Sequence, residues 1–195
     1  MRLAVLVSGE GTNLQAIIDA IDSGAIRGVT VDCVASSRPE AHAVQRAKNH
    51  GIATVILKKK ELTDQLLEIF RKVDLVVLAG FLWILPPEVL GVRPIINVHP
   101  SLLPLFGGKG MYGERVTEEV LKSGMKVTGV TVHLVTEDVD AGPIILQECV
   151  RINEDDTPST LLERMHPIEH ELIVKAIKLF SEKKYKIEGK RVIFL

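Results

Sequence analysis

The chain has 195 residues, of which 46% are hydrophobic and 4% aromatic, and its formal net charge is −1. This length fits one domain with a buried core, and the near-zero net charge gives no indication of a general nucleic-acid or membrane partner. The apolar start Leu3–Val7 is too short for a signal peptide, and no apolar run approaches the ~18 residues of a membrane span. We therefore expect a cytoplasmic protein without a membrane or nucleic-acid partner.

Strands and helices alternate in the first half of the chain. Apolar runs predict strands and apolar residues at helical spacing predict helices. The strands are expected at Leu3–Val7, Val29–Ala35, Thr54–Leu57 and Leu75–Leu78, and the helices at Leu14–Ile21, Pro39–His50 and Lys60–Lys72. This alternation implies right-handed crossovers and a parallel sheet, and ligands bind at the carboxyl ends of such strands.

The second half has fewer crossovers. We expect strands at Pro94–Val98, Val127–Leu134 and Ile144–Val150 and helices at Val116–Lys122 and Pro158–Phe180. The last two strands are predicted to pair antiparallel, because only a turn separates them. The fold class is therefore α/β, with a mostly parallel sheet flanked by helices and a mixed C-terminal part. Cys33 and Cys149 both lie in apolar, strand-like runs, which predicts buried, reduced thiols.

A glycine turn, Gly9–Asn13, connects the first strand to the first helix. Glycines let backbone amides approach an anion, and a helix N-terminus adds a favourable dipole. Leu14 stands where a dinucleotide fingerprint has its third glycine, and the P-loop lysine is absent, so the pattern favours a single phosphate. An ordinary tight turn with Asn13 as a local cap is the alternative.

Two further polar segments follow predicted strands. Asn97 and His99 are two residues apart, hence on one side of an extended chain, and an amide beside an imidazole can stabilise an oxyanion. A carboxylate such as Asp140, held beside His99, would raise its pKa and help to move a proton. The alternatives are a structural histidine and a simple Asp-Ala-Gly-Pro turn.

Other chemistries are not indicated. The histidines form no His-Glu-x-x-His pattern, and the pair His166 and His170 has no evident third ligand, so no metal is expected. Ser101 lacks the Gly-x-Ser-x-Gly context of a serine hydrolase.

Three motifs in this order resemble the glycinamide ribonucleotide formyltransferase (phosphoribosylglycinamide formyltransferase) family. They are the glycine loop continued by Asn13-Leu14, the run Asn97–Pro104 (Asn-Val-His-Pro-Ser-Leu-Leu-Pro), and Asp140–Pro143. Leu78–Phe81 and Ile168–His170 extend the resemblance over essentially the whole chain.

The resemblance implies a single Rossmann-like formyltransferase domain, 1–195, with a nucleotide-binding half (1–100) and a folate-binding half (101–195). It implies transfer of a formyl group from 10-formyltetrahydrofolate to the amine of glycinamide ribonucleotide in purine biosynthesis, without a metal, by a monomer or homodimer. The catalytic residues would be Asn97, His99 and Asp140, with Asn97 and protonated His99 donating to the oxyanion.

The resemblance also implies binding and supporting residues. Gly11, Thr12 and Asn13 would hold the phosphate, and Gly80 and Glu169 the rest of the nucleotide. The folate would meet Lys60, Leu82, Trp83, Ile84, Leu85, Asn97, Thr136, Glu137, Asp138, Val139 and Asp140. His133 and Ser101 would support the site.

This chain departs from many relatives at three places. Trp83 stands where many carry Arg, a histidine frequent near Thr117 is missing, and Gly107–Gly113 resembles one subgroup.

Formyltetrahydrofolate hydrolases, which usually have a second His at Pro100 and an N-terminal regulatory domain, are the nearest alternative. Methionyl-tRNA formyltransferases usually have Gly there and a C-terminal RNA-binding domain. A non-catalytic nucleotide-binding module would not need Asn97, His99 and Asp140.

Overall fold

The computed structural model describes residues 1–195, which form two compact units, Met1–Asn97 and Val98–Leu195. The first unit alternates strands with helices, as the sequence predicts. Its elements are β1 (Arg2–Val7), α1 (Thr12–Asp22), β2 (Thr30–Ser36), α2 (His42–Asn49), β3 (Ala53–Ile56), η1 (Lys59–Glu61), α3 (Leu62–Phe70), β4 (Leu75–Leu78), η2 (Pro87–Val89) and the start of β5 (Ile95–His99).

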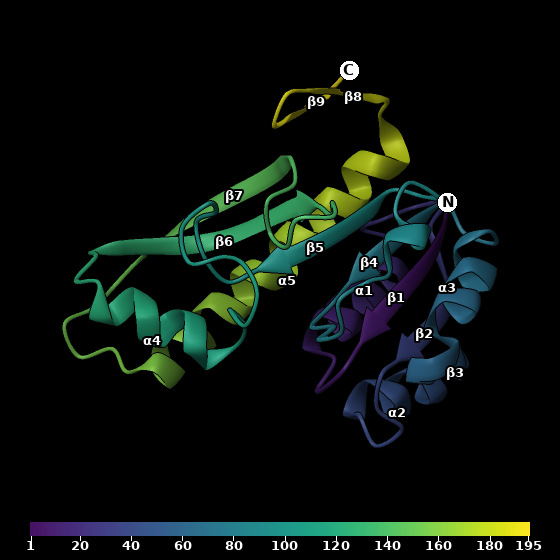
Figure 1. The fold of residues 1–195 in the computed structure, drawn as a ribbon, viewed down its shortest axis with the longest axis horizontal. Helices are drawn as coiled ribbons and strands as arrows, with labels where there is room; N and C mark the ends of the chain where they lie inside the picture. Colours follow the sequence, from purple (N-terminus) through teal and green to yellow (C-terminus); the bar gives the residue numbers. More distant parts are fainter. The chain divides into compact units, whose positions relative to one another are not determined.

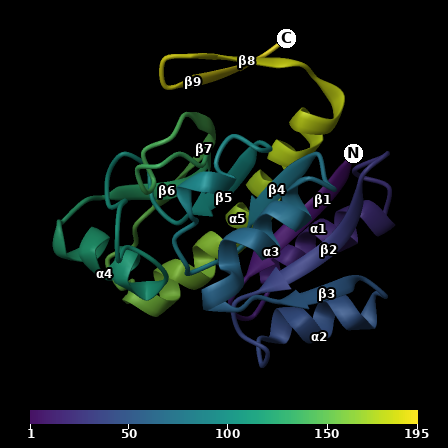
Figure 2. The same cartoon turned by 45° about the vertical axis from the view of Figure 1, so that its right-hand side comes forward.

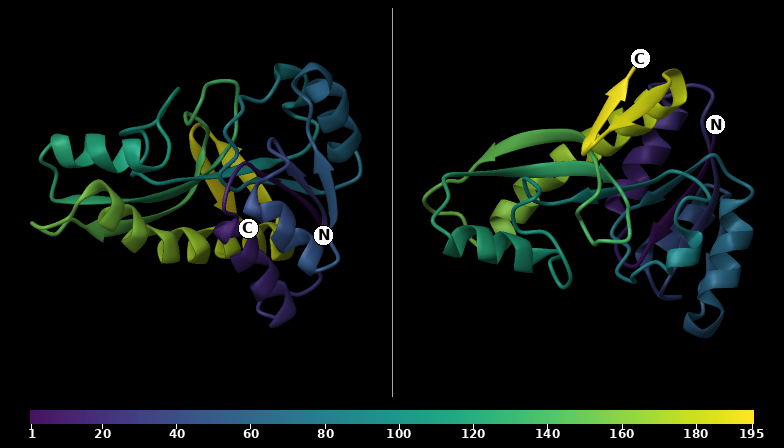
Figure 3. Two further views of the ribbon diagram at one scale, coloured as in Figure 1. Left: turned by 90° about the horizontal axis from the view of Figure 1, so that it is seen from below. Right: turned by 45° about the horizontal axis from the view of Figure 1, so that its top comes forward.

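The strands of the first unit run parallel in the order β3-β2-β1-β4-β5. β1 is central, and every residue of Leu3–Val7 is fully buried. Figure 1 shows α1, α2 and α3 around these strands, and Figure 3 shows that α1 and α2 cover one face while α3 covers the other. Helices on both faces explain why Leu3–Val7 is apolar at every position.

The edge strand β3 packs beside α2 (Figure 2). α2 is shorter than predicted, because it begins at His42 and not at Pro39. The amide of Ala41 donates to the carbonyl of Arg38, at 3.4 Å, which places Pro39 inside a turn. Proline is favoured at the second position of such a turn as well as in the first turn of a helix, so the sequence did not discriminate between the two.

The second unit is built around one long helix. Its elements are the end of β5, α4 (Glu114–Lys122), β6 (Val127–Leu134), β7 (Ile144–Arg151), α5 (Pro158–Glu182), β8 (Tyr185–Glu188) and β9 (Arg191–Phe194). β6 and β7 pair antiparallel, and α5 packs against both of them and against α4 (Figure 3). The α/β fold with a mostly parallel sheet and a mixed C-terminal part is therefore confirmed.

The C-terminal tail forms a hairpin that the sequence did not predict. β8 pairs antiparallel with β9, and Gly189 takes a left-handed turn conformation, with φ 59°, between them. Phe180 at the end of α5 packs on Tyr185 and Phe194, with ring centroids 4.7 and 5.5 Å away. Aromatic packing between the end of α5 and the two strands thus helps to hold the hairpin.

Candidate functional site

His99 and Asp140 lie side by side in the second unit. His99 is the last residue of β5, and Asp140 belongs to the turn between β6 and β7. His99 Nδ1 is 3.5 Å from Asp140 Oδ2, and the two side chains are only 4% and 9% exposed. The fold thus brings together an imidazole and a carboxylate that the sequence alone could not connect.

A short segment covers this pair, and we call it the strap, Phe106–Gly108. The Nε2–H of His99 donates to the Phe106 carbonyl at 2.9 Å, and the Gly108 amide donates to Asp140 Oδ2 at 2.9 Å. Between them, a Cβ on Gly107 would come within 3.1 Å of the Asp140 Cβ. Glycine is therefore needed where the strap passes over the carboxylate.

Burial and charge act on the pair in opposite directions. Burial lowers the pKa of His99, while the Asp140 carboxylate and the Phe106 carbonyl offset part of this change and His133 adds to it. Desolvation of the charged imidazole outweighs the carboxylate, so the pKa of His99 lies below its ordinary value although Asp140 acts on it in the predicted direction. Burial favours neutral Asp140 as well, but His133, His99 and the Gly108 amide together hold the pKa of Asp140 below its ordinary value.

Ser101 and His133 occupy supporting positions. The Ser101 hydroxyl donates to the Leu105 carbonyl at 2.6 Å, and Thr131 on β6 donates to the Ser101 carbonyl at 2.6 Å. His133 Nε2 is 3.5 Å from Asp140 Oδ1, and its Nδ1 donates to the Leu134 carbonyl at 2.9 Å. These contacts fix the segment that leads from His99 to the strap and one side of the carboxylate.

The glycine loop of the first unit opens directly into α1. Gly11 precedes the helix with φ 73°, and a Cβ there would lie 2.6 Å from the Ala43 Cβ. The Glu10 carbonyl accepts from Arg46 at 2.8 Å, and the Gly9 carbonyl accepts from the Ala43 amide at 3.1 Å. Two loop carbonyls are thus turned toward α2, and the loop is followed by the amides at the N-terminus of α1.

The loop that follows β4 joins the carboxyl ends of three strands. Gly80 has φ 71°, and the Leu82 amide donates to Ser8 Oγ at 3.0 Å. Ser8 Oγ in turn lies 2.6 Å from Ser37 Oγ. Leu82 and Ile84 are exposed, Trp83 is half-buried and Leu85 is buried. The edge of the sheet at which α/β proteins bind ligands therefore carries these residues.

Trp83 has two neighbours that sequence reasoning missed. Lys59 Nζ lies 6.0 Å from the centroid of its ring, and the ring of Phe81 meets it edge-on at 6.3 Å. Lys60, the lysine predicted to meet the folate tail, is exposed on η1. A run of three lysines, 58–60, gives no signal of which one turns toward the tryptophan.

The remaining predicted residues are placed as follows. Thr136–Val139 form an exposed turn in which the Ala141 amide donates to the Asp138 carbonyl, and Glu169 is buried on α5. The first unit carries Gly11, Thr12, Asn13, Lys60, Gly80, Leu82, Trp83, Ile84, Leu85 and Asn97, and the second carries His99, Ser101, His133, Thr136, Glu137, Asp138, Val139, Asp140 and Glu169.

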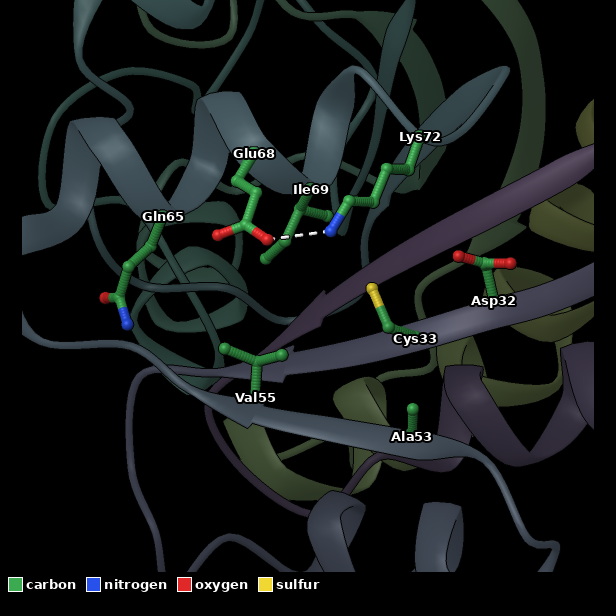
Figure 4. A pocket seen from close by; sticks show the side chains of 8 residues that line it. All are labelled: Asp32, Cys33, Ala53, Val55, Gln65, Glu68, Ile69 and Lys72. Carbon is green, nitrogen blue, oxygen red and sulfur yellow. Dashed lines mark hydrogen bonds and ion pairs between the residues drawn. The ribbon is translucent and has the colours of Figure 1, made fainter.

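A cavity of about 270 Å³ lies elsewhere in the first unit, between α3 and the strands β2 and β3 (Figure 4). It is lined by Asp32, Cys33, Ala53, Val55, Gln65, Glu68, Ile69 and Lys72, none of which is a predicted site residue. Lys72 pairs with Glu68 at 2.7 Å, and Asp32 pairs with Arg2 at 2.9 Å. Its charged groups are thus already matched within the chain.

The two thiols differ, contrary to the sequence prediction. Cys33 is buried as expected, but Cys149 is exposed, since Gln147–Cys149 on β7 face solvent. Burial, with Asp32 nearby, raises the pKa of Cys33 to about 11, which leaves it protonated at neutral pH.

A thiol reagent at pH 8 is therefore expected to modify Cys149 at least ten times faster than Cys33, as mass spectrometry of digested protein would measure. Equal rates would contradict this placement.

The structure contains no group of three or more His, Cys, Asp or Glu side chains that could hold a metal ion. None of its helices combines the length and the apolar character that a membrane span requires.

Comparison with known proteins identifies the family to which the sequence is similar. The model of the formyl transferase family ("Formyl transferase") matches residues 1–177. The chain is 37% identical to the chloroplastic phosphoribosylglycinamide formyltransferase of Arabidopsis thaliana, over 95% of its own length and 67% of that protein. It is 36% identical to phosphoribosylglycinamide formyltransferase of Haemophilus influenzae, over 96% of its own length and 90% of that protein.

A solved structure agrees with the sequence comparisons. Glycinamide ribonucleotide transformylase 1 from Symbiobacterium toebii superimposes with a TM-score of 0.92 and 40% identity, over 100% of this chain and 94% of that one. The family model covers most of the chain and the solved structure superimposes over all of it, so this chain belongs to the formyl transferase family.

Proposed function

We propose that this chain transfers the formyl group of 10-formyltetrahydrofolate to the amine of 5′-phosphoribosylglycinamide, giving the N-formyl product and tetrahydrofolate in purine biosynthesis. The relatives that bear the name of this activity align over nearly the whole chain, which supports the transferase over the hydrolase. The observation that carries the chemistry is the 3.5 Å approach of His99 and Asp140 in a nearly closed site.

The reaction needs charge stabilisation and one proton transfer. The substrate amine attacks the formyl carbon, a C–N bond forms, and negative charge develops on the formyl oxygen. Asn97 and protonated His99 stabilise that charge, and Asp140 stabilises the imidazolium. Asp140 relays the amine's proton through water to N10 of the folate, whose bond to carbon then breaks. Burial makes a charged His99 costly, and the nearby oxyanion offsets this cost.

The folate and the nucleotide use different residues. The loop Leu82–Leu85 and the turn Thr136–Asp140 line the pterin site, largely through backbone groups, and Lys60 contacts the tail. Gly80 and Glu169 contact the glycinamide or ribose portion. In this view residues 1–100 hold mainly the nucleotide and residues 101–195 complete the folate site, within a single domain. The cytoplasmic location and the monomeric or homodimeric state stay predictions.

The phosphate is held at the N-terminus of α1 by Gly11, Thr12 and Asn13. Gly11→Ala is expected to raise KM for the nucleotide about tenfold or more without changing KM for the folate, because hydrogen bonds to a charged group contribute roughly 1.5–3 kcal/mol. The added Cβ would lie 2.6 Å from the Ala43 Cβ and displace the loop. Steady-state kinetics with each substrate varied in turn measures both constants.

Gly24→Ala is the control for this variant. Gly24 also has a positive φ, 75°, beyond the other end of α1, but a Cβ there would meet nothing within 4 Å. It therefore reproduces the backbone cost without touching the phosphate loop. Equal changes in both KM values for Gly11→Ala would argue against the phosphate assignment.

The activity itself is tested by supplying the purified protein with both substrates and measuring the folate product by absorbance. Product is expected only when the nucleotide is present. Product formed at the same rate without the nucleotide, with release of formate, would establish a hydrolase. No product under either condition would refute both activities.

A further inference from the structure

The strap places a hydrogen-bond acceptor at each nitrogen of His99. On one side the Phe106 carbonyl lies 2.9 Å from Nε2, and on the other Asp140 Oδ2 lies 3.5 Å from Nδ1. A carbonyl can only accept, so the contact at 2.9 Å requires a proton on Nε2. A neutral imidazole has a single N–H, and therefore it can satisfy only one of these two acceptors.

The two acceptors compete for that proton. A carboxylate by itself would draw the neutral ring into the Nδ1–H form, as it does where it orients a catalytic histidine. Here the geometry favours the Nε2–H form, since the Phe106 carbonyl lies at an ideal hydrogen-bond distance from Nε2 and the carboxylate lies at the outer limit of hydrogen-bond distance from Nδ1. Only the imidazolium satisfies both, and it gains its second proton on Nδ1, facing Asp140.

The backbone that presents the carbonyl is held in an unusual conformation. Phe106 has φ 53°, one of two positive φ values outside glycine in this chain. A bulky residue in this region is strained, so surrounding contacts must hold it there. These contacts are the His99 hydrogen bond before Gly107, the packing of Gly107 on Asp140, and the Gly108 amide on Oδ2.

We infer that the main-chain carbonyl of Phe106 is a positioning group that keeps one proton on Nε2 of His99 and directs the proton that His99 gains to Nδ1, beside Asp140. This inference rests on the proposed function for its role in catalysis, but not for the tautomer itself. Asp140 and His133 are the titratable side chains that act on His99, and neither lies on the strap.

Phe106→Val and Phe106→Asn form a matched pair that tests it. Both remove the aromatic ring, but valine resists a positive φ whereas asparagine adopts it readily. Nitrogen-15 NMR of histidine-labelled, ligand-free protein reads the tautomer. We expect the neutral His99 of the unsubstituted chain and of Phe106→Asn to carry its proton on Nε2. Phe106→Val should shift it to Nδ1, because only the Asp140 acceptor remains.

The activity gives a second, independent reading. Loss of the carbonyl removes an interaction that favours imidazolium, so the pH at which kcat falls should move lower in Phe106→Val and stay in place in Phe106→Asn. A merely structural role would lower kcat equally at every pH. Should Phe106→Val fail to fold, Gly107→Ala displaces the strap by its Cβ, 3.1 Å from the Asp140 Cβ and 2.6 Å from Leu103 Cδ2.

The outcomes are distinct. An Nδ1–H tautomer in the unsubstituted chain overturns the inference, and so does an unchanged Nε2–H tautomer in Phe106→Val, or in Gly107→Ala should Phe106→Val fail to fold. The NMR result stands whether or not the chain transfers formyl groups. Failure of the proposed function would therefore appear only in the activity measurements.

Discussion

Replacing Asp140 with asparagine is expected to lower kcat by roughly 10²–10⁴ while both substrates still bind, since this is the usual contribution of general acid–base catalysis. Asparagine has the same shape and tolerates the positive φ of 57° at this position, so the turn should persist. The change removes the charge that offsets part of the effect of burial on the pKa of His99. Steady-state kinetics and a thermal melt measure activity and folding separately.

The pH dependence follows from the same contacts. Burial already lowers the pKa of His99, and Asp140 raises it in part, so removing the carboxylate should lower this pKa further. Activity that depends on imidazolium is lost as the pH rises through that value. The falling limb of the kcat profile should therefore move to lower pH in Asp140→Asn.

Two further variants complete the test. His99→Ala should act on the same step, and the double variant should lose much less than the product of the two single losses, because the residues work as a unit. Asp155→Asn, an exposed carboxylate of the second unit, is the charge-matched control and should leave kcat unchanged. A nearly silent Asp140→Asn would mean that this carboxylate only shapes its turn.

Replacing Asn97 with alanine is expected to lower kcat by about 10²–10³, the usual cost of losing one oxyanion donor. Asn97 is on β5 two residues before His99, so strand alternation directs both side chains to one face. Truncation leaves the developing charge with one donor fewer, and the loss should fall on kcat more than on either KM. Steady-state kinetics at saturating substrate measures it.

Asn49→Ala is the control for this variant, since Asn49 is exposed at the end of α2 and bonds only within that helix, to Gln45. An increase in KM for the folate with kcat unchanged would contradict the oxyanion role, because Asn97 would then bind the ground state and the transition state equally.

Segments with a strong local pattern were predicted well. The unbroken apolar run at Leu3–Val7 and the stretch Val127–Leu134 became β1 and β6 within one residue of their expected limits. The start of α2 was predicted too early, at Pro39, because a proline fits both a turn and the first turn of a helix. Strand β8 was not predicted, because it is stabilised by packing of aromatic rings with Phe180 and Phe194. Local propensity carries no information about contacts between such separate segments.

The sequence by itself determined the α/β class, and its motifs indicated the formyl transferase family and the residue types needed for acyl transfer. Only the tertiary structure decided that His99 meets Asp140, because that contact depends on how the turn after β6 folds back onto the end of β5. It also decided that burial outweighs the Asp140 carboxylate in setting the pKa of His99, and it revealed the Phe106 carbonyl at Nε2. Burial and backbone contacts set these properties, and neither is encoded in the spacing of side chains along the chain.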